Sequence, residues 1–124
     1  MLTVRDLLNR KGYDVWSVRP DSFVYDAIKL MAEKEIGALV VMEEWKVVGI
    51  ISERDYARKV ILQGRSSKTT QVREIMTTPP VYASAEQGVE ECMALMTEKR
   101  IRHLPVMDEL GLCGRRLWGQ AFTS

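Results

Sequence analysis

The chain has 124 residues, of which 46% are hydrophobic and 28% charged, with 18 basic and 17 acidic side chains. This length allows one folding unit, with one core or two small fused cores, but not two independent domains. Because the charges nearly cancel, the basic field that draws proteins onto nucleic acid or anionic lipid is missing, and neither partner is expected.

Cysteine and histidine are scarce. Cys92 and Cys113 are not in a paired-ligand spacing and His103 is the only histidine, so no metal site is expected. Two thiols without a disulfide framework indicate a reducing compartment, and no apolar run has the length of a membrane span. We therefore expect a soluble cytoplasmic protein.

A strand and a helix are predicted first. Residues 14–18 are a strand candidate, and Pro20-Asp21-Ser22 supplies a turn and an N-cap. Ile36-Gly37 is expected to end the helix that follows. Its apolar residues recur at i, i+3, i+4 and i+7, which is typical of a helix with one buried face: Val24, Ala27, Ile28 and Met31.

A hairpin and a second helix come next. Residues 38–42 and 47–51 are apolar runs of strand length around a polar turn, which predicts a hairpin. Ser52 begins a helix through about Leu62, with Gly64 as its C-cap. The order of elements is therefore strand, helix, strand, strand, helix.

The chain repeats itself. A shift of 65 positions aligns residues 24–44 with 89–109, and ten of the 21 aligned pairs are identical. A second echo aligns residues 4–7 with 72–75, so each half begins with a short helical lead-in. We therefore divide the chain into a first unit, 1–64, a linker, 65–71, and a second unit, 72–124, which diverges after about residue 109.

The second unit departs from the repeat near its end. Residues 112–120 should repeat 47–55, but only a leucine and a glycine are compatible, and Arg115-Arg116 falls where two buried strand residues belong. The sequence thus predicts that the last strand and helix are lost and that the last dozen residues are poorly ordered or pack irregularly. Residues 104–107 are then expected to form an edge strand.

A frameshift is one hypothesis for this divergence. Read one base later from Cys113 to Gln120, permitted codons give Val-Gly-Val-Val-Ser-Gly-Asp, which nearly restores the motif of the first unit. The nucleotide sequence decides between a shifted and a native tail.

With this element order, the duplication and the segment Gly49-Ile50-Ile51-Ser52-Glu53-Arg54-Asp55 closing the first unit, the chain resembles a pair of CBS (cystathionine-β-synthase) domains, of the free-standing type without an attached enzyme or transporter. The resemblance covers about residues 4–108. It implies an α/β (α+β) fold of two pseudo-two-fold-related β-α-β-β-α units, of which the second is incomplete here. It also implies a homodimer, and adenosine-containing ligands (AMP, ATP, NAD or S-adenosylmethionine) in clefts between units.

Ser52 and Asp55 are the leading site residues. They stand where a strand ends and a helix begins, a place that favours an anion. An aspartate can accept both hydrogens of a ribose diol and a serine can donate to a phosphate; in the family the matching positions do these jobs. The alternative is a plain helix cap. Arg54 and Arg58 are close enough in sequence to supply positive charge to a phosphate. The alternative is that they lie on a solvated face of the helix.

The resemblance implies further ligand contacts. Trp16 suits stacking on a purine, or packing in the core or a dimer interface. Arg102 and His103 are candidates for phosphate contacts from the second unit, although a lone histidine is more often structural. The implied adenine and phosphate positions are Val15, Trp16, Ser17, Val18, Gly37, Ala38, Leu39, Arg102, His103 and Pro105.

Three functions are weighed. A regulatory module that senses an adenosyl ligand, needing no cofactor, is preferred; a structural dimerisation module with a vestigial pocket is the alternative. An enzyme is not expected and no catalytic residue is assigned, because no nucleophile with an adjacent base and no phosphate-binding loop is present in the sequence.

Overall fold

The computed structural model describes residues 2–6, 16–44, 46–84, 86–101, 103–107 and 120–123. Two compact units are formed: one is Trp16–Pro80, and the other combines Met1–Val15 with Val81–Ser124. Within the described ranges no helix is long and apolar enough to cross a bilayer.

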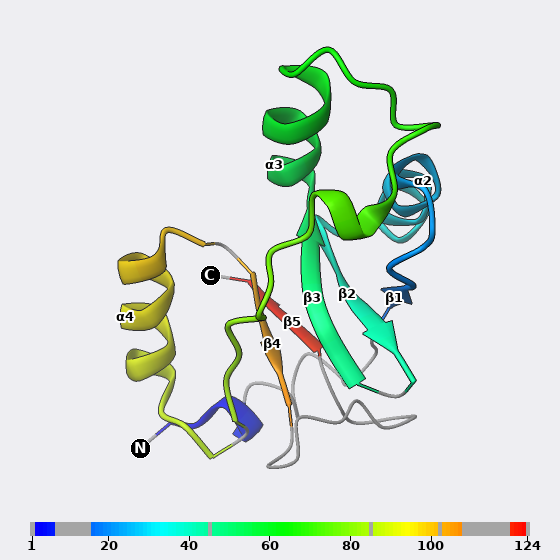
Figure 1. The fold of residues 1–124 in the computed structure, drawn as a ribbon. Helices are drawn as coiled ribbons and strands as arrows, with labels where there is room; N and C mark the ends of the chain where they lie inside the picture. The colour runs from blue at the N-terminus through cyan, green and yellow to red at the C-terminus, as the bar shows by residue number, and fades with distance from the viewer. Residues whose placement is uncertain are drawn as a thin grey trace. The chain divides into compact units, whose positions relative to one another are not determined.

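A three-stranded sheet organises the unit Trp16–Pro80 (Figure 1). Its central strand β2 (Ala38–Glu43) pairs in parallel with β1 (Ser17–Val18) and antiparallel with β3 (Lys46–Ser52). The expected hairpin is thus confirmed, and the strand predicted over 14–18 is confirmed at Ser17 and Val18 but does not include Trp16. The strands are rich in β-branched residues, as a buried sheet favours.

Helix α2 (Val24–Lys34) buries the predicted apolar stripe but begins differently from the prediction. Its N-cap is Phe23 and no side chain caps it, so the N-cap expected at Pro20-Asp21-Ser22 is wrong. The first two N–H groups instead donate to carbonyls remote in sequence, Val24 N to Thr70 O at 2.8 Å and Tyr25 N to Ser67 O at 3.0 Å. Because these partners satisfy the open end of the helix, no capping side chain is needed.

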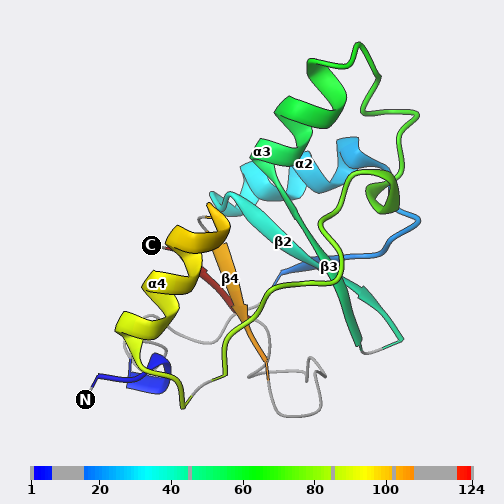
Figure 2. The same cartoon turned by 60° about the vertical axis from the view of Figure 1, so that its left-hand side comes forward.

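The second predicted helix is formed, with one irregular turn. α3 (Glu53–Tyr56) continues as the π-helical turn η1 (Ala57–Ile61) and ends at the C-cap Leu62. The C-cap predicted at Gly64 is therefore wrong, although Gly64 lies two residues later with a φ of 66°, a conformation that favours glycine. α2 and α3 are in contact, and Figure 2 shows them next to each other.

The lead-in segments are exchanged between the repeats. The 3₁₀ helix η2 (Val72–Glu74) of the second repeat donates from Val72 N to Ser22 O at 2.8 Å, and Val72 is buried with Val24 in the core of the unit Trp16–Pro80. The matching bonds of the other unit join Val4 N to Gln87 O at 2.9 Å and Val89 N to Leu2 O at 3.0 Å. The packing units therefore do not coincide with the repeat boundaries 1–64 and 72–124.

The unit that holds residues 81–124 repeats part of this architecture, and its described residues include no counterpart of α3. Helix α4 (Val89–Lys99) precedes β4 (His103–Val106), which pairs antiparallel with β5 (Gln120–Thr123), and Ala83 bridges Val106 in parallel. Figure 2 shows α4 beside β4. Val4 is buried with Cys92 and Leu104 in the core of this unit.

The expectation that the last strand is lost, leaving residues 104–107 as an edge, is wrong. β5 pairs with β4 along its whole length, with His103 opposite Thr123 and Val106 opposite Gln120. An exposed strand edge offers unpaired N–H and C=O groups that any extended segment can satisfy, and residues 120–123 do so. Residues 108–119, where the divergence begins, lie outside the described residues, and the frameshift stays a hypothesis.

Candidate functional site

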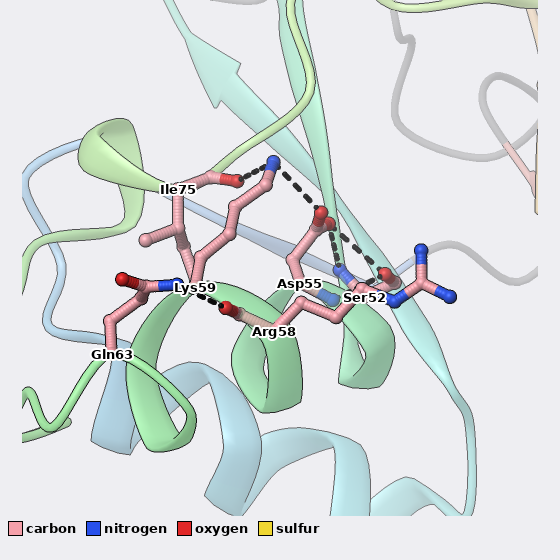
Figure 3. A network of polar contacts seen from close by, with 6 residues as sticks. All are labelled: Ser52, Asp55, Arg58, Lys59, Gln63 and Ile75. Atoms are coloured by element: carbon pink, nitrogen blue, oxygen red, sulfur yellow. Dashed lines mark hydrogen bonds and ion pairs between the residues drawn. The ribbon is translucent and has the colours of Figure 1, made fainter.

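Ser52 and Asp55 form a reciprocal cap where β3 passes into α3 (Figure 3). Ser52 Oγ accepts from Asp55 N at 3.2 Å, and Asp55 Oδ2 accepts from Ser52 N at 2.9 Å and from Ser52 Oγ at 3.0 Å. This capping box satisfies N–H groups at the start of the helix. The cap that the sequence offered as the alternative is therefore present, and it draws together the two residues proposed for ligand binding.

Lys59 completes the surroundings of Asp55. Its Nζ lies 3.1 Å from Asp55 Oδ1 and donates to Ile75 O at 2.9 Å. The Asp55 side chain is 12% exposed, whereas the Lys59 side chain is 45% exposed. Sequence reasoning missed this lysine, although the i, i+4 spacing of an acid and a base on one helix is a signal that finds such pairs.

Two of the residues proposed for adenine lie beside this cap. Ala38 is the sheet partner of Ser52, and Glu53 N donates to Gly37 O at 3.0 Å. Leu39 follows on the same strand, but its side chain is packed in the hydrophobic core. Ser52, Gly37 and Ala38 are therefore brought together, with Leu39 offering only its backbone.

The first strand lies further along β2. Ser17 is opposite Val40 and Val18 is opposite Val41. Trp16 is 41% exposed, and the Lys34 ammonium lies 4.1 Å from the centroid of its ring. This cation–π contact occupies one face of the indole, so a purine stacking on that face has to displace Lys34. Val15 lies outside the described residues.

The remaining candidates are less closely tied to the cap. Arg54 and Arg58 are exposed on α3 and η1, and Arg58 O accepts from Gln63 Nε2 at 3.5 Å. His103 and Pro105 are in β4 of the other unit. Arg102 is outside the described residues.

The arrangement can accept hydrogen bonds at an acid that is already held in place. Asp55 takes three donors, two on Oδ2 and one on Oδ1. An ionised carboxylate offers about four acceptor positions, so a diol with two hydroxyl donors can bind here if one present donor leaves. Ser52 Oγ can turn its hydrogen from Asp55 to an incoming oxygen.

Comparison with known proteins identifies the family. The CBS domain family matches residues 4–62 and 72–115. The CBS domain-containing protein CBSX3 of Arabidopsis thaliana, a mitochondrial protein, is 43% identical over 122 aligned positions. The alignment covers 90% of this chain but only 59% of the plant protein.

Solved structures agree with this assignment. A protein with CBS domains from Burkholderia ambifaria MC40-6 is 54% identical, with a TM-score of 0.81 over 88% of this chain and 80% of that one. The CBS domain pair of protein MJ0100, solved in complex with 5′-methylthioadenosine and S-adenosyl-L-methionine, is 26% identical, with a TM-score of 0.84 over 100% of this chain and 90% of that one. The resemblance noted from the sequence is thus confirmed: the chain belongs to the CBS domain family and is a tandem CBS pair, a regulatory module.

Proposed function

We propose that this module senses an adenosine-containing ligand, held by Ser52 and Asp55 of the first repeat. The observation that carries the proposal is the junction of β3 and α3, where a hydroxyl and a carboxylate lie 3.0 Å apart beside Gly37 and Ala38. The bound adenosyl compounds named for the MJ0100 pair support the same ligand class here.

Each group has a distinct part in this proposal. Asp55 accepts from the ribose hydroxyls, which needs an ionised acid held in a fixed position, and the Ser52 backbone N–H holds it. The Ser52 hydroxyl donates to a phosphate or another oxygen of the ligand. No bond is made or broken, and binding acts by stabilising one state of the module over another.

Ligand-dependent melting tests the proposal. The chain is titrated with AMP, ATP, NAD and S-adenosylmethionine, and a ligand at a hundred times its dissociation constant stabilises the native state by about 2.7 kcal/mol. Asp55→Asn is expected to weaken binding roughly tenfold to a hundredfold, since a hydrogen bond to a charged group contributes about 1.5–3 kcal/mol. Asp26→Asn is the matched control, because Asp26 is an exposed acid in the first turn of α2.

Failure has a clear signature. If none of the four compounds raises the melting temperature, or if Asp55→Asn binds as well as Asp26→Asn does, the assignment of the ligand to this junction is wrong. A ligand that protects only the Asp26→Asn and unmodified proteins supports it.

A second function, a structural dimerisation module with a vestigial site, is favoured by one observation. Ser52 and Asp55 bond to each other and Lys59 bonds to the remaining oxygen of Asp55, so both oxygens of Asp55 have a partner without a ligand. Light scattering coupled to size exclusion distinguishes the two: this alternative expects a homodimer whose mass and stability do not respond to any of the four compounds.

A further inference from the structure

Lys59 joins two parts of the unit Trp16–Pro80 through one nitrogen. Its Nζ is 3.1 Å from Asp55 Oδ1 on α3 and 2.9 Å from Ile75 O, the residue directly after η2 (Figure 3). The two partners are twenty residues apart in the chain, so the ammonium ties the capped start of the helix to a distant segment.

The segment that Lys59 contacts, residues 75–77, lies near the end of this unit. Ile75 is 1% exposed in the core, and Thr77 pairs with β3, donating from its N to Ile50 O at 2.8 Å and accepting at its O from Ile50 N at 3.1 Å. Residues 75–77 are thus held by β3 on one side and by Lys59 on the other. The unit ends shortly afterwards, at Pro80.

We propose that Lys59 competes with the ligand for Asp55, and that its displacement breaks the hydrogen bond from Lys59 Nζ to Ile75 O, which we call the grip on Ile75. This inference rests on the function proposed above, and it adds the route by which occupancy of the site is transmitted. Ligand binding at Asp55 then affects residues 75–77, because the hydrogen bond from Lys59 Nζ to Ile75 O is present only while the site is empty.

The donors around Asp55 decide which one leaves. Two come from Ser52, one of them its backbone N–H, whose position is fixed by β3. Lys59 has a half-exposed side chain, so its ammonium regains water when it leaves. A ribose diol needs two acceptor positions, and removal of the Lys59 donor supplies the missing one.

Hydrogen exchange without any ligand tests the grip itself. The amides of Ile75 and Met76 are protected because both donate to Val72 O, at 3.1 and 3.0 Å. Lys59→Met keeps the aliphatic stem and removes both bonds, so these amides are expected to exchange about threefold to tenfold faster. Lys59→Arg restores slow exchange, and Lys29→Met, at an exposed lysine of α2, changes nothing.

Calorimetric titration with AMP and S-adenosylmethionine tests the competition. Lys59→Met is expected to bind about threefold to tenfold more tightly than the unmodified chain, and the ligand is expected to speed exchange at Ile75 and Met76 only while Lys59 is present. Weaker binding by Lys59→Met makes the lysine a ligand contact and overturns the competition, as does unchanged affinity. Unchanged exchange in the ligand-free variant overturns the grip.

The two proposals fail separately. If the unmodified chain binds and Lys59→Met binds no more tightly, only the competition is wrong. If neither protein binds, the function proposed for the site is wrong and the competition falls with it, whereas exchange without ligand still decides the grip.

Discussion

The two repeats pair their strands alike but reach that pairing from different sequence. In the first, β2 has Ala38 opposite Ser52 and Val41 opposite Gly49. In the second, β4 has His103 opposite Thr123 and Val106 opposite Gln120. The repeat shift of 65 carries Ala38 to His103 and Val41 to Val106, so corresponding residues of β2 and β4 are paired with an antiparallel strand in both units.

The segments that pair with β2 and β4 do not correspond in the repeat. The repeat counterpart of Gly49 is Gly114, yet Gln120 takes its place opposite Val106, six positions later (120 − 114). Thr123 holds the register position of Ser52, a threonine where the first repeat has serine. Backbone pairing does not depend on side-chain identity, so another segment can restore it. The hydroxyl and the acid do depend on it, and the repeat counterparts of Ser52 and Asp55 are Leu117 and Gln120.

The largest effect is expected from substitutions in the two hydrophobic cores. Leu39 and Leu104 are repeat counterparts, 1% and 0% exposed. Replacing either by alanine is expected to cost about 2–5 kcal/mol of unfolding free energy, because a buried leucine leaves a cavity. Urea denaturation measures both losses. A loss below about 1 kcal/mol for Leu104→Ala alone would show that the second core is not closed as the first is.

Substitution of the repeat-related glycines Gly49 and Gly114 tests how β5 pairs with β4. A Cβ on Gly49 would be 2.8 Å from Met76 Sδ and 2.9 Å from Thr77 O, so Gly49→Ala is expected to cost about 1–3 kcal/mol as an overpacking change. Gly114→Ala is expected to cost less, because Gln120 and not Gly114 is opposite Val106. Equal losses in urea denaturation would place Gly114 on a strand like Gly49 and contradict the register of β5.

Local patterns in the sequence predicted the elements well. The apolar stripe of α2, the hairpin and the Ser52 cap each depend on residues within one turn or one strand, and the structure has all three. The repeat predicted that α4 and β4 would copy α2 and β2.

Contacts between distant segments were not predictable in the same way. The first N–H groups of α2 donate to the carbonyls of Ser67 and Thr70, and backbone acceptors have no signature in sequence. The exchange of lead-ins, the use of residues 120–123 as a strand and the bond from Lys59 to Ile75 are of the same kind. The acid and the hydroxyl of the candidate site were predicted from the sequence. Their neighbour Lys59, which bonds to the acid, was found only in the folded structure.

The hydroxyl caps of the two units provide the next test. Ser52 Oγ accepts from Asp55 N at 3.2 Å, and Thr3 Oγ1 accepts from Asp6 N at 3.3 Å. Ser52→Ala is expected to cost about 1–2 kcal/mol and Thr3→Ala about 0.5–1 kcal/mol, within the range for N-caps. The first is larger because Ser52 also donates to the buried Asp55. Chemical denaturation measures the order, and a larger loss for Thr3→Ala would contradict it.

The smallest expected effect is the response to acid, in which both units take part. The backbone N–H of Gln71 and then the Arg65 side chain lower the pKa of Glu74, and the Arg5 side chain lowers the pKa of Glu86. A carboxyl whose pKa is lowered by folding stabilises the native state above its ordinary pKa of 4.5, and this contribution is lost as the pH falls through the folded value. Unfolding followed from pH 6 to pH 3 should therefore lose less stability in Glu74→Gln and in Glu86→Gln than in the unmodified chain. Both acids are exposed, so the two losses are small; an acid response that neither variant reduces would assign it to other carboxyls.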